Sequence, residues 1–191
     1  MSRLDSFIRR MQAQRACLDY AARLISPLPG NVLEFGLGNG RTYDHLRLAL
    51  PARDIYVFDR QLTAHRSCIP PADRLFLGDV LRTLPTAVAR LGSNTALANI
   101  DIGTGDDGVT RELAHLIAPF LVQVLKPGAV VVSGVSINHG ALCSLALPHD
   151  VEPGRHFVFS RVDRFGSDTN TFRAANANTL GERRCILATD R

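Results

Sequence analysis

Tryptophan is absent from the 191-residue sequence, and the aromatic fraction is only 6%. A protein that binds single-stranded nucleic acid by stacking its bases needs exposed aromatic side chains, and this composition offers few. Lysine is scarce as well, because 21 of the 22 basic residues are arginine. The net charge of +4 is scattered and forms no dense basic run, so it is compatible with an anionic substrate without requiring one. We therefore do not expect a nucleic-acid partner.

The sequence also lacks paired cysteines, metal-binding motifs and long apolar runs. Its four cysteines are never spaced as CxxC, which favours reduced thiols in a cytoplasmic protein over a disulfide framework. Its six histidines show no HExxH spacing, so no metal site is expected. No run of 18 apolar residues could span a membrane, and the first 15 residues lack the apolar core of a secretion signal. We expect a cytoplasmic location and no membrane partner.

The length and hydrophobic content predict a single folded unit. A chain of 191 residues is near the size of one ordinary domain, and 46% of its residues are hydrophobic. We expect one domain over residues 1–191, with an N-terminal amphipathic helix in 1–28, a cofactor-binding half in 29–135 and a substrate-side half in 136–191. Apolar residues at helical intervals predict the helix itself over 3–25. A homo-oligomer is compatible with this sequence.

Short β-type runs alternate with segments of helical length through the first two thirds of the chain. Apolar runs without polar alternation suit parallel strands that are buried on both faces. The expected strands are 31–35, 55–58, 75–77, 96–100 and 129–135, the expected helical segments lie near 40–50, 62–69, 80–91 and 110–125, and a final antiparallel pair is expected at 156–162 and 184–188. This pattern predicts an α/β fold: a doubly wound, mostly parallel seven-stranded sheet with the last strand antiparallel and helices on both faces.

A glycine-rich loop follows the first predicted strand. Gly36, Gly38 and Gly40 lie between that strand and a predicted helix, where a tight turn can bring the backbone close to a ligand. The dinucleotide fingerprint GxGxxG is not met, because Arg41 stands where its third glycine would be. Glu34, two residues before the loop, would repel a pyrophosphate and suits a cationic ligand. The loop therefore favours a nucleoside that carries positive charge.

Four predicted strands bring a carboxylate to the same edge of the sheet. Glu34, Asp59, Asp79 and Asp101 each stand at the end of a predicted strand, and Asp59 follows the glycine loop at a distance that suits a ribose acceptor. Asp79 could accept a hydrogen bond from an exocyclic amine such as that of adenine. Asp59 and Asp79 could instead be helix caps. Together the four acids would serve a positively charged ligand that contains ribose and adenine.

These motifs resemble those of the class I S-adenosylmethionine-dependent methyltransferases, in a small form without an appended substrate domain. The resemblance covers about residues 30–135 and includes, besides the glycine loop and the strand-end acids, Asn99-Ile-Asp101 and Leu125-Lys-Pro-Gly-Ala129. It implies S-adenosylmethionine as the cofactor. The cofactor-binding residues that it implies are Glu34, Phe35, Gly36, Gly38, Gly40, Asp59, Arg60, Leu62, Gly78, Asp79, Val80 and Asp101.

The same resemblance implies methyl transfer to an acceptor that the motifs do not identify. No Asn-Pro-Pro-Tyr or Asp-Pro-Pro-Tyr follows the fourth strand, which argues against exocyclic-amine methylation of DNA or protein glutamine. A small-molecule acceptor is expected, with Asp101 and His139 as candidate catalytic residues. Asp106 and Asp107 could bind a metal beside a catechol-like substrate, or could begin a helix. A nicotinamide-dependent oxidoreductase and a non-catalytic nucleoside-binding protein are the alternatives.

Overall fold

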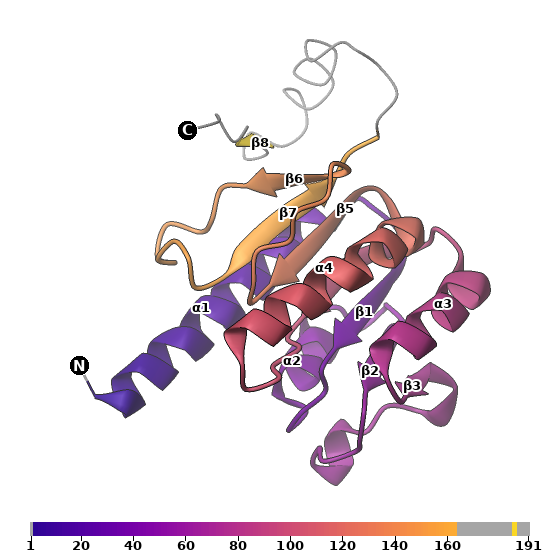
Figure 1. The fold of residues 1–191 in the computed structure, drawn as a ribbon, viewed down its shortest axis with the longest axis horizontal. Helices are drawn as coiled ribbons and strands as arrows, with labels where there is room; N and C mark the ends of the chain where they lie inside the picture. Colours follow the sequence, from indigo (N-terminus) through magenta and orange to yellow (C-terminus); the bar gives the residue numbers. More distant parts are fainter. Residues whose placement is uncertain (1, 164–184, 187–191) are drawn as a thin grey trace.

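The computed structural model describes residues 2–163 and 185–186, and in them the chain forms one mixed β-sheet (Figure 1). The sheet has the strand order β3-β2-β1-β4-β5-β7-β6-β8. Its strands are β1 (Asn31–Phe35), β2 (Ile55–Asp59), β3 (Leu75–Leu77), β4 (Thr95–Ile100), β5 (Leu125–Ser133), β6 (Leu142–Leu145), β7 (Phe157–Arg161) and β8 (Cys185–Ile186). The five strands expected in the first two thirds of the chain are all present.

The first five strands are parallel, and β7 runs antiparallel to β5. β6 in turn runs antiparallel to β7, so it has the direction of the first five. The α/β class with a mostly parallel seven-stranded sheet is confirmed, and β8 adds a two-residue strand beside β6. The expected direct pairing of 156–162 with 184–188 is wrong, because β6 lies between β7 and β8. The sequence reading missed β6, which is four residues long and partly exposed.

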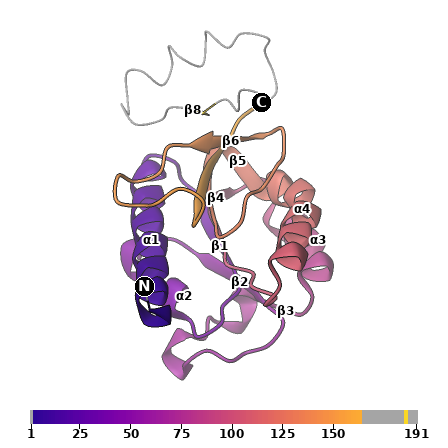
Figure 2. The ribbon, with the colours of Figure 1, turned by 60° about the vertical axis from the view of Figure 1, so that its left-hand side comes forward.

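Helices cover both faces of the sheet, as Figure 2 shows. One face carries α1 (Arg3–Leu24) and α2 (Arg41–Ala49), and the other carries α3 (Val80–Leu91) and α4 (Asp107–Val124). The helical segment expected near 62–69 is wrong. A single 3₁₀ turn, Arg66–Cys68, stands there instead, and a second one, Ala72–Arg74, follows it. Two consecutive prolines between them prevent a continuous helix, since proline has no N–H to donate.

The core forms two layers, one on each side of the sheet. All residues of β1 and β4 are buried, as expected of central strands that helices cover on both faces. Among the cysteines, Cys17 and Cys68 are buried free thiols. Cys143 is disulfide-bonded, so the expectation of reduced thiols is wrong at that position. Within the described ranges, no helix has the length and apolar character needed to cross a bilayer.

The strand order indicates at which edge of the sheet a ligand would bind. Parallel strands end at one edge, and ligands bind in the crevice where the strand order reverses. Here the chain leaves β1 toward β2 and β3 and then crosses to β4, so the reversal lies between β1 and β4. β7 is antiparallel, and it therefore begins at the edge where β4 and β5 end. The ends of β1, β2, β3 and β4 and the start of β7 thus share one edge.

Candidate active site

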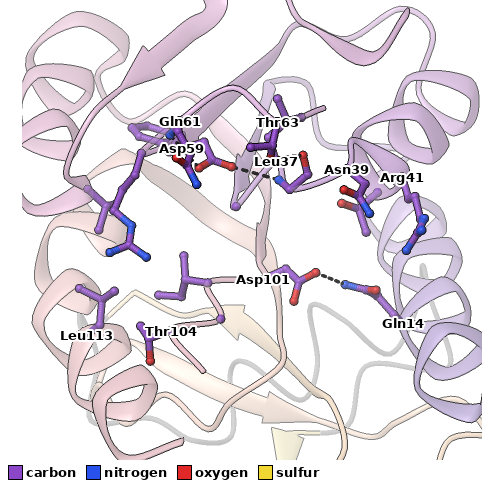
Figure 3. A pocket seen from close by; sticks show the side chains of 18 of the residues that line it. Gln14, Leu37, Asn39, Arg41, Asp59, Gln61, Thr63, Asp101, Thr104 and Leu113 are labelled. Carbon is purple, nitrogen blue, oxygen red and sulfur yellow. Dashed lines mark hydrogen bonds between the residues drawn. The ribbon is translucent and has the colours of Figure 1, made fainter. Parts of the chain in front are cut away.

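A cleft of about 690 Å³ opens at this edge of the sheet (Figure 3). Its walls come from the loop after β1, the ends of β2, β3 and β4, the first half of α1 and one residue of α4. The lining residues are Arg10, Met11, Gln14, Gly36, Leu37, Gly38, Asn39, Arg41, Thr42, Phe58, Asp59, Arg60, Gln61, Thr63, Gly78, Asp79, Val80, Asp101, Ile102, Gly103, Thr104 and Leu113. The volume is that of a small-molecule site.

Two glycines of the loop that lines the cleft, Gly36 and Gly38, have positive φ angles but differ in the space around them. Gly36 has φ +90°, and a Cβ there would lie 2.3 Å from the Asp101 carbonyl oxygen. Gly38 has φ +48° and open space where its Cβ would point. The backbone at Gly38 is therefore available for close approach by a ligand. Gly40 begins α2 without a side-chain cap, so the first N–H groups of that helix can receive a carboxylate.

Asp59 links the glycine loop to the end of β2. One of its carboxylate oxygens accepts from the Gly38 N–H at 3.0 Å, and the other accepts from the Gln61 N–H at 3.2 Å. The Thr63 hydroxyl donates to the Gly38 carbonyl at 3.2 Å, which ties the next loop to the same point. Figure 3 shows Asp59, Gln61 and Thr63 gathered along one side of the cleft. This carboxylate lines the cleft and does not begin a helix, and its role as a ribose acceptor stays a prediction.

Asp79 serves two purposes at the end of β3. It is the N-cap of α3 and accepts from the Leu81 N–H at 2.8 Å. It also lines the cleft together with Gly78, Val80 and Arg60. The cap and the ligand-facing position are thus compatible, because one carboxylate offers two oxygens.

Asp101 lies opposite, where α1 meets the end of β4. The Gln14 side-chain amide of α1 donates to the Asp101 carboxylate at 2.9 Å, and Figure 3 shows this bond. Gln14 is buried, whereas Asp101 is exposed to the cleft. Arg10 and Met11, one turn earlier in α1, line the same wall. The first helix therefore closes one end of the cleft in addition to packing on the sheet.

Glu34 does not line the cleft. Strand alternation turns its side chain beneath the glycine loop, where it is fully buried and hydrogen-bonded to the Thr42 hydroxyl. The Asn99 amide, in register on β4, donates to its other oxygen at 2.9 Å. Burial raises the pKa of Glu34 to about 8, against the two hydrogen bonds and helped by the charge of Asp101. The cleft is therefore bordered by three carboxylates, and the fourth is a neutral support below it.

Several other expected site residues lie away from the cleft. Phe35 is fully buried and stacks on Phe58 with ring centroids 4.5 Å apart. A Cβ on Gly40 would point toward Cys68, and Leu62 is exposed between two lining residues without being one of them. His139 accepts from the Ala141 N–H through Nδ1 at 3.2 Å, which shapes the turn before β6. Which way each of these side chains points depends on the local backbone, and the sequence motif of the glycine loop and strand ends does not specify it.

The acidic pair after β4 begins a helix. Asp106 is the N-cap of α4 and accepts from the N–H groups of Gly108 and Val109 at 2.7 and 3.0 Å. These bonds lower the pKa of Asp106. In the described part of the chain, no group of three or more histidine, cysteine, aspartate or glutamate side chains could hold a metal ion. The helix-start interpretation of this pair agrees with the structure.

Sequence reasoning did not single out the residues of α1 that line the cleft. A signal was present, because Gln14 is a polar residue within the buried stripe that contains Ala13, Cys17 and Leu18. A buried amide in such a stripe needs a hydrogen-bond partner. That partner is Asp101, 87 residues further along the chain.

Exchange of Glu34 for glutamine tests the neutral state of this buried carboxyl. A carboxyl whose folded-state pKa is raised contributes stability at low pH that is lost as the pH rises through that value. Between about pH 5 and pH 8 we expect the unfolding free energy of the wild type to fall, relative to Glu34→Gln, by up to about 1.4 kcal/mol per pH unit. Urea unfolding over this range measures the difference. Glu112→Gln, on the exposed face of α4, is the matched control, and parallel curves for wild type and Glu34→Gln would contradict the expectation.

Comparison with known families agrees with this site. A family model described as S-adenosyl-L-methionine methyltransferase matches residues 1–161. The chain belongs to this family. No curated protein matches the sequence at a significant level. The protein is thus an S-adenosylmethionine-dependent methyltransferase, and the alternative of a nicotinamide-dependent oxidoreductase is set aside.

Solved structures support the same assignment. The crystal structure of an S-adenosyl-L-methionine methyl transferase from Silicibacter pomeroyi DSS-3 is 41% identical, with a TM-score of 0.80 over 84% of this chain and 99% of that chain. The MycE methyltransferase of the mycinamycin biosynthetic pathway, in complex with Mg, SAH and mycinamycin VI, is 16% identical. Its TM-score is 0.50 over 83% of this chain and 51% of that chain, so it shares the fold.

Proposed function

We propose that this methyltransferase acts on a small-molecule acceptor that enters the cleft beside α1. The observation that carries the proposal is the Gln14–Asp101 hydrogen bond, which joins α1 to the end of β4 and narrows the cleft on that side. A cleft of about 690 Å³ that must also hold the cofactor leaves room for a small acceptor. A duplex or a folded RNA would need a broad open surface instead.

The charges near α1 also support a small acceptor. Arg9 and Arg155 both form ion pairs with Glu152, at 3.8 and 3.3 Å. The two arginines share one carboxylate, so together they keep about one positive charge, fewer than the several free charges that a phosphate backbone needs along its path. Arg10 lines the cleft itself, where it could pair with an acidic group on the acceptor.

The residues fit S-adenosylmethionine. Three carboxylates border a cleft that has open space beside the Gly38 backbone, and such a site favours a cationic nucleoside over a phosphate-rich one. We assign the ribose to Asp59, and the adenine to Asp79, with Arg60 and Val80 alongside. The methionine end would lie along the glycine loop, with its carboxylate at the start of α2. Asp101 would face the methionine amine or the methyl group.

When bound, S-adenosylmethionine supplies a methyl group on a sulfonium: the acceptor's lone pair forms the new bond to the methyl carbon, while the carbon–sulfur bond breaks and its electron pair stays on sulfur. The protein's part is to align the acceptor and exclude water. The first half of α1 limits the acceptor's directions of approach, and Gln14 fixes the Asp101 carboxylate. An acceptor that must lose a proton also needs a base at this end.

A methyl-transfer assay tests the acceptor class. Purified protein is incubated with S-adenosylmethionine labelled in its methyl group and, separately, with a low-molecular-mass cell extract, total RNA or total protein. We expect the label in the small-molecule fraction and none in the polymers. Asp59→Ala, which should bind the cofactor weakly, is the control for background transfer. Label that stays with RNA or protein at the rate of the small-molecule reaction would overturn the proposal.

A further inference from the structure

His156 lies at the same edge of the sheet as Asp101, although 55 residues separate them in the chain. Asp101 directly follows β4, and Ile100 at the end of β4 pairs with Ser133 at the end of β5. Ser133 pairs in turn with Phe157, the first residue of β7, so His156 stands just before that strand. The two backbones are thus about two strand spacings apart, or about 10 Å.

Both side chains belong to the α1 face of the sheet. Val158 packs in the core layer that contains α1, while Phe157 and Phe159 pack in the other layer. Alternation along the strand therefore directs His156 to the α1 face. Asp101 lies on this face too, since its carboxylate accepts from Gln14 of α1. Asp101 lines the cleft, and His156 lies on the same side of the sheet without lining it.

His156 is buried, and one of its ring nitrogens has no hydrogen-bond partner in the described part of the chain. Its side chain is 4% exposed, and its Nδ1 is buried without a hydrogen-bond partner among the described residues. Buried polar atoms in native proteins nearly always have a partner, and an exception needs an explanation. No hydrogen bond in the described fold depends on this nitrogen, so it is available for a proton.

The charges around His156 come from three elements. Burial lowers the pKa of His156, the Asp101 carboxylate raises it, and Arg10 of α1 and Arg155 lower it further. The net direction is downward, so the imidazole is neutral at neutral pH. Asp101 is the one carboxylate among these neighbours, and a single carboxylate balances a single positive charge.

We infer that His156 and the sulfonium of the cofactor are alternative cations beside Asp101, so that the imidazole is neutral with S-adenosylmethionine and can take a proton with the demethylated product. The inference rests on the proposed position of the methyl end near Asp101. In the reaction, the acceptor's O–H or N–H proton passes to the imidazole as the sulfonium charge disappears. The site then holds one positive charge before and after transfer.

Affinities for S-adenosylmethionine and S-adenosylhomocysteine, measured by calorimetry from about pH 8 to about pH 5, test this. The ligands share their nucleoside and amino-acid groups, so the ratio of their Kd values isolates the sulfonium. We expect a constant ratio at high pH and, below the imidazole pKa, a growing preference for the product that approaches tenfold per pH unit. His156→Gln should keep the ratio constant throughout. His115→Gln, on the exposed face of α4, should behave as the wild type.

A ratio that stays constant in the wild type, that still changes in His156→Gln, or that loses its change in His139→Gln would overturn the inference. If His156→Gln does not fold, proton release by the wild type decides. Binding at about pH 6 in two buffers of different ionisation enthalpy should release protons with S-adenosylmethionine and not with the product. Equal proton release for both ligands would contradict the inference. Failure of both ligands to bind would instead count against the proposed cofactor site.

Discussion

Replacing Gly36 with alanine is expected to lower the unfolding free energy by about 2–5 kcal/mol, the sum of a left-handed backbone and an overpacked contact. The new Cβ would lie 2.3 Å from the Asp101 carbonyl oxygen, and backbone on both sides prevents relief. The Gly36 N–H donates to Phe58 at 2.8 Å, and the Asp101 N–H donates to Phe35 at 2.9 Å. The loop is therefore fixed between β2 and β4 and cannot move away from the clash.

Gly38→Ala is the matched control for this experiment. Its φ is also positive, but its Cβ would point into open space, so we expect a stability loss of only about 1–2 kcal/mol. Because that space belongs to the cleft, Gly38→Ala should weaken cofactor binding more than it weakens the fold. Thermal unfolding and calorimetry measure the two effects. Equal stability losses for both variants would show that the contact with Asp101 is not what restricts position 36.

Replacing Asp59 with alanine is expected to weaken S-adenosylmethionine binding by about 1–3 kcal/mol, or roughly fivefold to 150-fold. The variant would lack the carboxylate that we propose binds the ribose, and the Gly38 and Gln61 N–H groups would lose their acceptor. Comparison of adenosine with 2′-deoxyadenosine separates these effects. Wild type should prefer adenosine, and Asp59→Ala should not. Asp73→Ala, an exposed acid outside the cleft, should preserve both affinity and preference. An unchanged preference in Asp59→Ala would limit Asp59 to shaping the loop.

The parallel half of the fold was predictable because its signals are local. Each buried strand is a short apolar run, and each strand end carries glycine or a carboxylate, so β1 to β5 and Asp59, Asp79 and Asp101 could be placed from the sequence. β6 could not, since Leu142–Leu145 is too short and too exposed to differ from a loop. The helix expected near 62–69 failed because helical length alone does not establish a helix.

The rest of the site depends on contacts between distant segments. Glu34 was expected in the cleft because it ends a strand, but its register with Asn99 turns it inward. His139 lies in the loop after β5 and was the natural histidine to choose. His156 gains its position only from the antiparallel pairing of β7 with β5, which no local pattern reveals. The role of Gln14 likewise depends on a distant residue, because its side-chain amide donates to Asp101.

Because β7 runs opposite to β1–β5, the segment that leads into it reaches the cleft edge from a different part of the chain than the loops after β1, β2 and β3. In the proposed site, nucleoside recognition belongs to the loops that leave β1, β2 and β3. The approach to the acceptor belongs to α1 and to the segment 146–155 that precedes His156 and β7. That segment can be lengthened, shortened or exchanged without displacing Asp59 or Asp79. Relatives of this enzyme can therefore diverge in what they methylate while keeping one way of holding the methyl donor. Grafting this one segment between them is the economical way to change acceptor choice.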